Sequence, residues 1–501
     1  MKYDDLNNLK EIIPDANEMI VERIKKSQKL KDLNTSLYPY SYKKTSHSID
    51  IINDFNNIKE NDSFSIAGRI MLLRNMGSSC FANLRDQEGD IQVYFNKKNL
   101  GLELYNIIKL FDIGDIIGVE GNVFKTKTDE ITLRAFKVTL LSKSIRPLPE
   151  KYHGLQDSDL KQRHRSLDMI MNKEVKKRFI NRAKAMSAIR EYLNNKGFIE
   201  IDTPILDTKY GGGEAKPFST YVNALNCEVF MNISPELYLK RLMVGGLERV
   251  YSFSRSFRNE GIDRTHYPEF TLFECYMAYA DYNDMMALME QLYEYVFTKV
   301  LGSTKISYNG ISIDFKVPWR RASMCDLIKE NLDISIENLS KKEIVKIIKE
   351  KNISINEELS LEELSKSDLI MSLFDDNCVD GLIQPTFVID FPKDSSPLCK
   401  THRQNNELIE RFEPYAYGVE LGNAYSELND PLAQRILLND QAKKLRAGFE
   451  TASPMDEEFA KALDIGMPPA GGLGIGIDRM IMFLTNTYSI KDVIAFPLVK
   501  R

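Results

Sequence analysis

Acidic and aromatic side chains alternate along two stretches of the sequence, in a pattern that could bind a cation. One stretch places four side chains on a single strand parity: Phe270, Leu272, Glu274 and Tyr276. The other, residues 419 to 427, places three on one parity: Asn423, Tyr425 and Glu427. Because every second side chain of a strand points to the same face, Glu274 and Glu427 could meet from different strands. An ammonium group that leaves water needs nearly complete pairing, so two carboxylates and a phenol predict a pocket for a positively charged ligand.

A second predicted strand precedes residue 258, and a charged loop joins it to the stretch around Glu274. Its odd positions are apolar, and its even positions predict an open polar face: Ser252, Ser254, Ser256 and Arg258. The loop itself contains Glu260, Arg264 and His266. A hairpin with a solvated loop is the simpler interpretation, since charged loops are usually just exposed to water. Either interpretation predicts two adjacent strands, with a guanidinium group on one and a carboxylate on the other.

Short strings in this region resemble a known enzyme family. FRNEG (257–261) followed by H-x-PEF (266–270) resembles motif 2 of the class II aminoacyl-tRNA synthetases, and FTLFECYMAYADY (270–282) looks like the lysyl-tRNA synthetases among them. GGLGIGIDRMIMFL (471–484) is similar to motif 3, and GFIEIDTPIL (197–206) to motif 1. Residues 411 to 431 resemble the family's metal-binding and amino-acid-binding strand. Together these matches cover most of residues 60 to 501.

The resemblance implies a lysine–tRNA ligase. Such an enzyme activates L-lysine with ATP to lysyl-adenylate plus pyrophosphate, and then transfers lysine to the 3′ end of tRNA(Lys). The implied lysine-binding residues are Gly212, Glu236, Arg258, Glu274, Tyr276, Asn423, Tyr425 and Glu427. Glu236 and a carbonyl near Gly212 would hold the α-amino group, while Arg258 and Asn423 would hold the α-carboxylate. The nucleophile would be the carboxylate of the amino acid itself, so no catalytic triad is required.

The family also implies an ATP site and a magnesium site. The ATP-binding residues would be Arg258, Glu260, His266, Phe270, Glu413, Glu420 and Arg479, with Arg258 and Arg479 as the catalytic pair. Phe270 would stack on adenine, flanked by Ser256 and Leu272. Glu413 and Glu420 would bind Mg²⁺. Strict alternation nevertheless places Glu420 on the face opposite Glu427, unless Gly422 marks a β-bulge that turns it inward.

The chain order predicts an α+β protein with an N-terminal OB-fold β-barrel and a class II catalytic domain, an antiparallel sheet flanked by helices. We expect a helical lead-in at 1–45, an anticodon-binding OB-fold at 46–144, a linker at 145–172 and the catalytic domain at 173–501, with a helical insertion at about 309–385. Helices are predicted at 173–196, ending at Gly197, and at 282–301. The motif 1 region implies a homodimer.

Five strands with a helix between the third and fourth are expected in the barrel, as in OB-folds that bind single-stranded nucleic acid. The residues at the positions of the family's anticodon readers are Arg69, Arg74, Phe81, Gln92 and Glu130. Residues 161–190 carry ten Lys or Arg against two acids. This basic tract could face the tRNA backbone or be a solvated helix face.

The composition of the chain limits which classes of protein it can belong to. With 501 residues and 43% hydrophobic residues, the chain has length for several domains, and its net charge of −5 requires any nucleic-acid binding to rest on local basic patches. Six scattered cysteines without a C-x-x-C pattern argue against a disulfide framework and suit a reducing compartment. No apolar run approaches the roughly 18 residues of a membrane span, so we expect a cytoplasmic protein.

Other interpretations remain at this stage. The acids could simply form surface salt bridges, the usual fate of glutamate. Specificity for aspartate or asparagine would require an arginine or a neutral amide donor in place of Glu274, Tyr276 and Glu427. A non-catalytic RNA-binding relative would be marked by loss of Arg258 or Arg479, and a paralogue that lysylates a protein would lack the barrel; all of these features are present.

Overall fold

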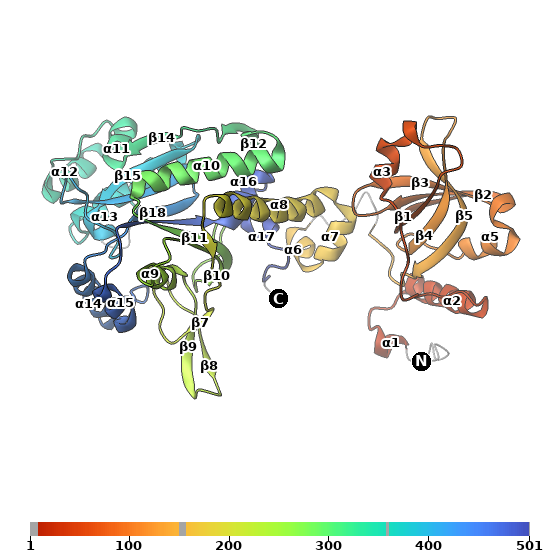
Figure 1. Cartoon of the computed structure of the whole chain (residues 1–501), viewed down its shortest axis with the longest axis horizontal. Coiled ribbons are helices and arrows are strands. Elements are labelled where there is room, and N and C mark those ends of the chain that lie inside the picture. Colours follow the sequence, from red (N-terminus) through yellow and green to blue (C-terminus); the bar gives the residue numbers. More distant parts are fainter. Residues whose placement is uncertain (1–8, 150–156, 357–359, 500–501) are drawn as a thin grey trace. The chain divides into compact units, whose positions relative to one another are not determined.

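The chain divides into two compact units, residues 1–156 and 157–501. The computed structural model describes residues 9–149, 157–356 and 360–499 (Figure 1). Parts of four expected segments therefore lie outside the described residues: 1–8 of the lead-in, 150–156 of the linker, 357–359 of the insertion and 500–501 of the catalytic domain. Among the described helices, none has both the length and the apolar character required to cross a membrane.

The N-terminal unit contains a closed five-stranded barrel, as predicted for an OB-fold. Its strands, in the spatial order β1-β2-β3-β5-β4, are β1 (Ser63–Met76), β2 (Ser79–Arg85), β3 (Asp90–Asn96), β5 (Ile131–Ser142) and β4 (Ile116–Lys125). Helices α4 (Lys97–Leu100) and α5 (Leu102–Ile108) lie between the third and fourth strands in sequence. Burial alternates along β2 and β3, so the apolar parity fills the barrel and the other parity faces outward.

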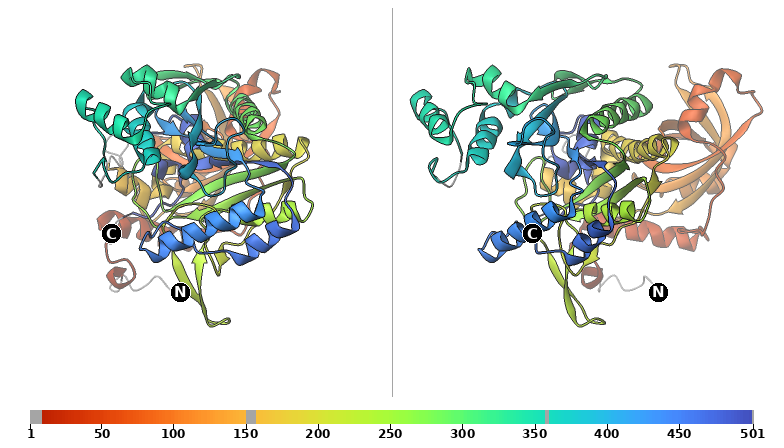
Figure 2. Two further views of the ribbon diagram at one scale, coloured as in Figure 1. Left: turned by 90° about the vertical axis from the view of Figure 1, so that its left-hand side faces the viewer. Right: turned by 60° about the vertical axis from the view of Figure 1, so that its left-hand side comes forward.

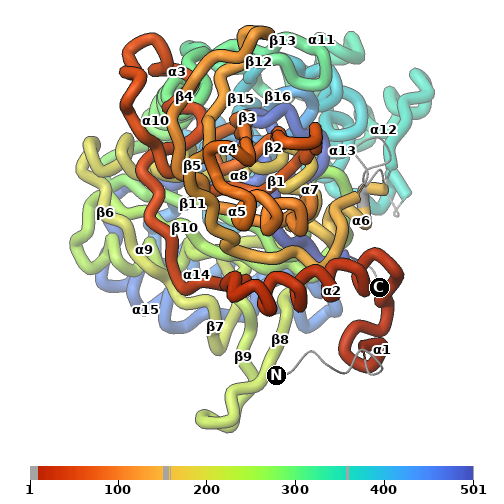
Figure 3. Tube along the Cα trace, turned by 90° about the vertical axis from the view of Figure 1, so that its right-hand side faces the viewer, coloured from red at the N-terminus to blue at the C-terminus, as the bar shows by residue number. Residues whose placement is uncertain are grey.

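The helical lead-in packs against this barrel. Its helices are α1 (Leu9–Ile12) and α2 (Glu18–Asp32). Helix α3 (Ser48–Asn53) and a 3₁₀ turn at Phe55–Asn57 follow it, at the start of the segment expected for the barrel domain. Asn17 caps α2 by accepting a bond from the Ile20 amide at 3.0 Å. Leu30 is buried in the barrel core, and Arg23 donates to the carbonyl of Ile113 at 2.9 Å. Figure 3 shows α2 running along one end of the barrel.

The C-terminal unit is built on a nine-stranded sheet. Its spatial order is β14 (Arg320–Ser323), β15 (Thr386–Pro392), β16 (Leu408–Ala416), β18 (Gly422–Ser426), β19 (Ala470–Gly476), β11 (Glu269–Ala278), β10 (Arg249–Phe257) and β6 (Ile199–Glu200), with β17 (Val419–Glu420) also paired to β16. Neighbours are antiparallel except at the two edges, β14–β15 and β10–β6. The predicted antiparallel sheet flanked by helices is therefore confirmed.

One face of the sheet is covered by α8 (Lys173–Asn195), α10 (Tyr282–Leu301) and α16 (Ile477–Leu484); the first two lie side by side in Figure 1. The helices predicted at 173–196 and 282–301 are confirmed, and Gly197 ends α8 with a φ of +79°, which favours glycine. Tyr251 of β10 and Phe273 and Cys275 of β11 are buried in the core beneath the helices. The opposite parity of β11 is therefore left for a site on the other face.

The expected open serine face of β10 is wrong, because Ser252, Ser254 and Ser256 are all buried. The chain before α9 (Glu236–Val244) covers this parity. Asn232 donates through Nδ2 to Ser254 Oγ at 2.6 Å, and its carbonyl accepts from the Phe257 amide at 2.8 Å. The serines thus fit beneath a second layer of chain, where a larger side chain would not pack.

The remaining elements surround the sheet. They are a three-stranded sheet of β7 (Leu206–Asp207), β9 (Cys227–Met231) and β8 (Ser219–Val222); a hairpin of β12 (Lys305–Tyr308) and β13 (Ile311–Asp314); helices α11 (Met324–Leu332), α12 (Lys341–Lys351), α13 (Lys366–Asn377) and α17 (Ile490–Val493); and 3₁₀ turns at Val379–Gly381 and Lys393–Ser395. Helices α14 (Pro431–Arg446) and α15 (Glu457–Ile465) pack together, as Figure 2 shows.

The segments predicted as a helical insertion (309–385) and as a linker (145–172) contain more structure than predicted. The segment 309–385 contains α11 to α13, but it also contains β13 and β14, and β14 is an edge strand of the main sheet. Residues 158–171 form α6 (Ser158–Arg163) and α7 (Arg165–Met171). Arg165 of this basic tract is buried and donates to the carbonyls of Ala495, Lys491 and Ile494. Part of the tract therefore holds the C-terminal segment in place.

Candidate active site

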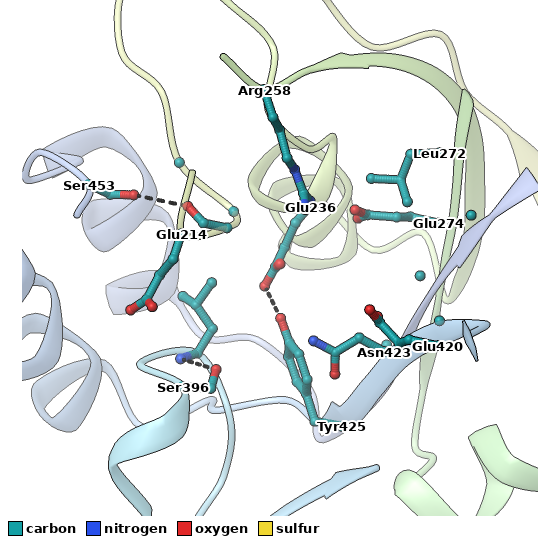
Figure 4. Close-up of a pocket in the computed structure, with 18 of the residues that line it drawn as sticks. Glu214, Glu236, Arg258, Leu272, Glu274, Ser396, Glu420, Asn423, Tyr425 and Ser453 are labelled. Atoms are coloured by element: carbon teal, nitrogen blue, oxygen red, sulfur yellow. Dashed lines mark hydrogen bonds between the residues drawn. The ribbon is translucent and has the colours of Figure 1, made fainter. Parts of the chain in front are cut away.

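A cavity of about 420 Å³ opens on the sheet face away from α8 and α10 (Figure 4). Its walls are β11, the strands β16 to β19, the loop before β8, and the loop between β10 and β11. Thirteen of the predicted lysine, ATP and metal residues line it: Gly212, Glu236, Arg258, Glu260, His266, Phe270, Glu274, Tyr276, Glu413, Glu420, Asn423, Tyr425 and Arg479. Residues from segments far apart in the sequence thus share one cavity.

Glu274 lies on the floor of this cavity with both carboxylate oxygens engaged. Ser234 donates to Oε1 at 2.7 Å, and the Tyr276 hydroxyl donates to Oε2 at 2.9 Å. Burial, together with the nearby Glu236, raises the pKa of Glu274 to about 7, although the two hydroxyl donors and Arg258 oppose the shift. A buried carboxyl group with a pKa of about 7 suits an incoming cation, because pairing with the cation favours the ionised form of the group.

Glu427 is the one predicted residue of this group that is set behind the cavity wall. It is 1% exposed, and its Oε1 would lie 1.9 Å from a Cβ atom added at Gly472, which lines the cavity. The Tyr276 ring would lie 2.6 Å from the same added atom. A glycine is therefore required at position 472, where Glu427 and the ring of Tyr276, whose hydroxyl bonds Glu274, approach the same wall. Burial raises the pKa of Glu427 to about 8, although Lys240 opposes the shift.

Glu236 stands at the first turn of α9 and is 4% exposed. Its Oε1 accepts from the Tyr425 hydroxyl at 2.7 Å, a bond drawn in Figure 4. The same oxygen accepts from Nζ of Lys240 at 2.5 Å. Lys240 was not predicted, although its position four residues after Glu236 on one helix face was a usable signal.

Arg258 follows β10 directly, where its backbone amide donates to the Pro268 carbonyl at 3.0 Å. Its guanidinium carbon lies 5.2 Å from the centre of the Phe270 ring. Burial lowers the pKa of Arg258, while Glu420, Glu260 and Glu274 oppose the shift. The guanidinium group thus lies within the field of three carboxylates, between the acidic floor and the aromatic wall.

Arg479, in the first turn of α16, contacts the other end of the cavity. Its Nη1 donates to Oε2 of Glu420 at 3.0 Å, and its Nη2 lies 3.0 Å from Nε2 of His266. His266 is further held by Asp263, whose Oδ2 lies 2.8 Å from Nδ1. Two guanidinium groups therefore reach the same cavity from different elements, an arrangement suited to a ligand with several negative charges.

A β-bulge explains why the Glu420 side chain points to the same face as Tyr425. Glu420 pairs with Tyr415, and Tyr425 pairs with Arg411. The chain therefore advances five residues from Glu420 to Tyr425 while the partner strand advances only four. The extra residue lies between β17 and β18, next to Gly422 as expected. It brings Glu420 to the cavity face together with Glu413 and Tyr425.

Arg411 supports this face and was not predicted. It contacts Oε1 of Glu413, and its Nε donates to Oδ1 of Asn423 at 3.2 Å. Its place two residues before Glu413 on one strand gives it the same facing. Burial raises the pKa of Glu413, with Arg411 opposing and Glu420 adding to the shift. Within the described parts of the chain, no three His, Cys, Asp or Glu side chains gather as a metal site on their own.

The barrel carries a separate row of aromatic rings. Phe81 and Tyr94 lie 4.8 Å apart, Tyr94 and Phe124 lie 6.0 Å apart, and the Arg134 guanidinium lies 4.5 Å above Phe124. Of these, only Phe81 was predicted; the others could have been found from strand parity, because Arg74, Phe81, Tyr94 and Arg134 are consecutive cross-strand partners.

Three of the other predicted barrel residues, Arg69, Gln92 and Glu130, are already hydrogen-bonded. Gln92 donates to Glu130 at 2.6 Å and accepts from Thr132 at 3.0 Å, so Gln92 and Glu130 form one polar group. Arg69 donates to the Gly114 carbonyl at 2.6 Å, which holds its side chain against the barrel backbone.

Comparison with known proteins bears on both units. The family of class II tRNA synthetases (D, K and N) matches residues 157–500, and the OB-fold nucleic acid binding domain matches residues 64–141. The chain is 47% identical to the lysine–tRNA ligase of Clostridium novyi (strain NT), over 97% of this chain and 95% of that protein. It is also 47% identical to the lysine–tRNA ligase of Thermoanaerobacter pseudethanolicus (strain ATCC 33223 / 39E), over 99% of this chain and 97% of that protein. For the lysine–tRNA ligase of Thermoanaerobacter sp. (strain X514) the identity is 48%, with the same coverage.

Proposed function

This chain belongs to the class II tRNA synthetases as a lysine–tRNA ligase, and from that premise we propose that the cavity of Figure 4 is where L-lysine and ATP react. The enzyme joins the two to form lysyl-adenylate and pyrophosphate, and then transfers lysine to the 3′ end of tRNA(Lys). The observation that carries the assignment is the acidic floor: Glu274 and Tyr276 line the cavity, and Glu427 lies directly behind Gly472.

The lysine side chain would point its ammonium group at this floor. Glu274, Tyr276 and Glu427 would surround it, because a desolvated ammonium requires carboxylate and hydroxyl partners. Glu236, Tyr425 and the backbone near Gly212 would hold the α-amino group; Gly212 has a φ of +77° and lies against Ser234 and Glu236.

The α-carboxylate would lie between Arg258 and Asn423. Because Arg411 donates to Oδ1 of Asn423, the amide nitrogen of that side chain remains as the donor toward the cavity. Arg258 would bind the carboxylate and the α-phosphate of ATP together. The carboxylate oxygen then attacks the α-phosphorus in line and pyrophosphate leaves, so the catalysis is mainly positioning and neutralisation of charge.

ATP would occupy the end of the cavity at Phe270 and Arg479. Phe270 offers an aromatic face for the adenine ring, and Arg479 approaches from α16. Glu260 and His266 are exposed on the loop between β10 and β11 and would meet the triphosphate.

Glu413 and Glu420 fit a magnesium site, because two carboxylates on one face beside a phosphate site are the donor set that Mg²⁺ prefers. Glu420 raises the pKa of Glu413, as expected of two acids that a cation would neutralise. When bound there, Mg²⁺ supplies charge neutralisation for the phosphates.

Ionisation of Glu274 gives a pH dependence. With a pKa of about 7, the carboxyl group is mostly protonated at pH 6 and mostly ionised at pH 8. The ionised form pairs with the ammonium group, so the KM for lysine should fall several-fold over this range. Steady-state kinetics at saturating ATP would measure it. The KM for ATP should change little. Glu274→Gln should make the lysine profile shallower, because only Glu427, with a pKa of about 8, would still titrate in this range; a profile as steep in that variant would contradict the assignment.

The barrel would bind the anticodon of tRNA(Lys) through Arg69, Arg74, Phe81, Gln92 and Glu130, with Tyr94 extending the platform. Stacking on an aromatic ring contributes about 1 to 3 kcal/mol per base. Phe81→Ala should therefore raise the KM for tRNA about tenfold or more and leave ATP–pyrophosphate exchange unchanged. Phe136→Ala is the matched control, since Phe136 is an exposed ring of β5 outside this row. Equal effects of the two changes would remove the barrel surface from the proposal.

The same premise covers the domains, assembly and location. We assign 1–45 to a helical lead-in, 46–144 to the anticodon-binding barrel, 145–172 to a linker and 173–501 to the catalytic domain. A homodimer through the motif 1 region is supported by exposed apolar side chains there: Ile199 at 47%, Ile205 at 44% and Leu206 at 47%. All six cysteines are free thiols, which supports the cytoplasm. Sedimentation analysis of the whole chain tests the dimer.

The decisive experiment for the function is ATP–pyrophosphate exchange with each of the twenty amino acids. Lysine alone should support rapid exchange. Faster exchange with aspartate or asparagine would overturn the assignment, and no exchange with any amino acid would favour a non-catalytic RNA-binding protein.

A further inference from the structure

An ammonium group of the protein itself lies behind the wall at the amino-acid end of the cavity. The side chain of Lys240 on α9 is fully buried. Its Nζ lies 2.5 Å from Oε1 of Glu236 and contacts Oε2 of Glu427. It also lies 6.0 Å from the centre of the Tyr276 ring and 5.4 Å from that of Tyr425. All four partners are residues that the proposed function assigns to the substrate.

We propose that Lys240 is a positioning residue that makes the pocket specific for an amino acid with two ammonium groups. It binds one oxygen of Glu236 and one of Glu427, and so directs their other oxygens toward the α-ammonium and the side-chain ammonium of the substrate. This inference rests on the proposed function of the cavity and adds a residue that does not touch the reacting atoms.

The balance of charge supports this role. Three carboxylates meet at this end of the cavity: Glu236, Glu274 and Glu427. When all three are ionised, as pairing with the substrate requires, the resident ammonium of Lys240 neutralises one charge and leaves two, which equals the number of ammonium groups on lysine. The substrate carboxylate is paired separately with Arg258. Without Lys240, three buried carboxylates would lie together, and at least one would take up a proton and cease to be an acceptor for a cation.

The arrangement of oxygens supports it as well. Lys240 and the Tyr425 hydroxyl both reach Oε1 of Glu236, so Oε2 is the oxygen assigned to the substrate. Oε1 of Glu427 has no hydrogen-bond partner in the described part of the chain and is packed against Gly472 on the cavity wall. A buried acceptor without a donor is costly, and a substrate ammonium at this wall would supply the donor.

Stability alone is a poor explanation for this group. A buried ion pair adds little folding stability compared with apolar side chains of similar volume, because both charges lose their hydration. The chain offers a comparison in Lys143, which is also fully buried and pairs with Asp112 and Asp115 of the barrel unit, away from the cavity. The two lysines share burial and pairing but differ in whether their partners line the amino-acid pocket.

The test compares Lys240→Met with Lys143→Met in ATP–pyrophosphate exchange. Methionine keeps the length of the chain and removes the charge. Lys240→Met should raise the KM for lysine about tenfold or more, the effect of losing a charged hydrogen bond, with the KM for ATP unchanged. Lys143→Met should leave both values unchanged. An unchanged or lower KM for lysine in a folded Lys240→Met variant would overturn the proposal.

A double variant guards against a variant that does not fold. Lys240→Met combined with Glu427→Gln removes both charges of one pair, so the change at Lys240 should raise the KM for lysine by a smaller factor in the Glu427→Gln background than in the unaltered enzyme. The part that remains is the effect through Glu236. If the KM for lysine of the double variant rose by the product of the two single fold-changes, Lys240 would act independently of Glu427, and the proposal would also be overturned. If the unaltered enzyme did not exchange with lysine, or Glu427→Gln had no effect, the proposed function itself would fail.

Discussion

Replacing Arg258 by alanine is expected to lower the rate of lysine-dependent ATP–pyrophosphate exchange by about a hundredfold to a thousandfold, the cost of removing one donor from a developing negative charge. Arg258 lines the cavity beside Phe270, and in the proposed function it contacts both the lysine carboxylate and the α-phosphate. The fold should survive, because Arg258 Nε has no hydrogen-bond partner in the described part of the chain that would be left unsatisfied.

Arg255→Ala is the matched control for this change. Arg255 lies on the same strand, pairs with Glu269 at 3.2 Å and does not line the cavity. Its variant should exchange at nearly the rate of the unaltered enzyme. Circular dichroism should give similar melting transitions for all three proteins. Normal exchange by a folded Arg258→Ala variant would remove this residue from the chemistry.

Norleucine, which is lysine without its side-chain ammonium, is expected to be rejected by about 10⁴-fold in kcat/KM, because it would leave buried acceptors without partners. Glu274 and Glu427 are 5% and 1% exposed, so water cannot replace the missing ammonium without opening the pocket. Ornithine keeps the ammonium and lacks one methylene group. Lysine should therefore be favoured over ornithine by only about 1 to 3 kcal/mol.

Exchange kinetics with the three amino acids at saturating ATP would measure both ratios. The order lysine, ornithine, norleucine is required by a charged floor. Comparable rates for lysine and norleucine would show instead that the pocket selects by length, and the roles assigned to Glu274 and Glu427 would be lost.

The sequence predicted the parts of the site that depend on short-range patterns. Alternation placed Phe270, Glu274 and Tyr276 on one face of one strand, and the structure brings all three to the cavity. The bulge near Gly422 could also be anticipated, because otherwise Glu420 would face away. In each case a period of two residues is enough to fix the facing of a side chain.

Longer-range features could not be predicted. The spacing of Lys240 from Glu236 was a usable signal, but the contact of Lys240 with Glu427 was not predictable, because the two residues lie far apart in the sequence. The strand β14 has the sequence RRAS, without apolar alternation, and exists because it pairs with β15. Tertiary contacts, rather than local propensity, decide such elements. The buried serines of β10 were misjudged for the same reason.

The alternation of site residues along β18 makes this part of the gene more sensitive to the loss of a codon than to a change of one. A substitution at Leu421 alters one buried side chain. An in-frame deletion within β18, such as that of Ala424, would make Asn423 and Tyr425 neighbours in sequence and turn them to opposite faces. Loss of the extra bulge residue would not do so, because Glu420 and Tyr425 would then be four residues apart and would still share a face. Natural variation among related enzymes should therefore conserve the spacing of this segment even where the identities of its residues drift.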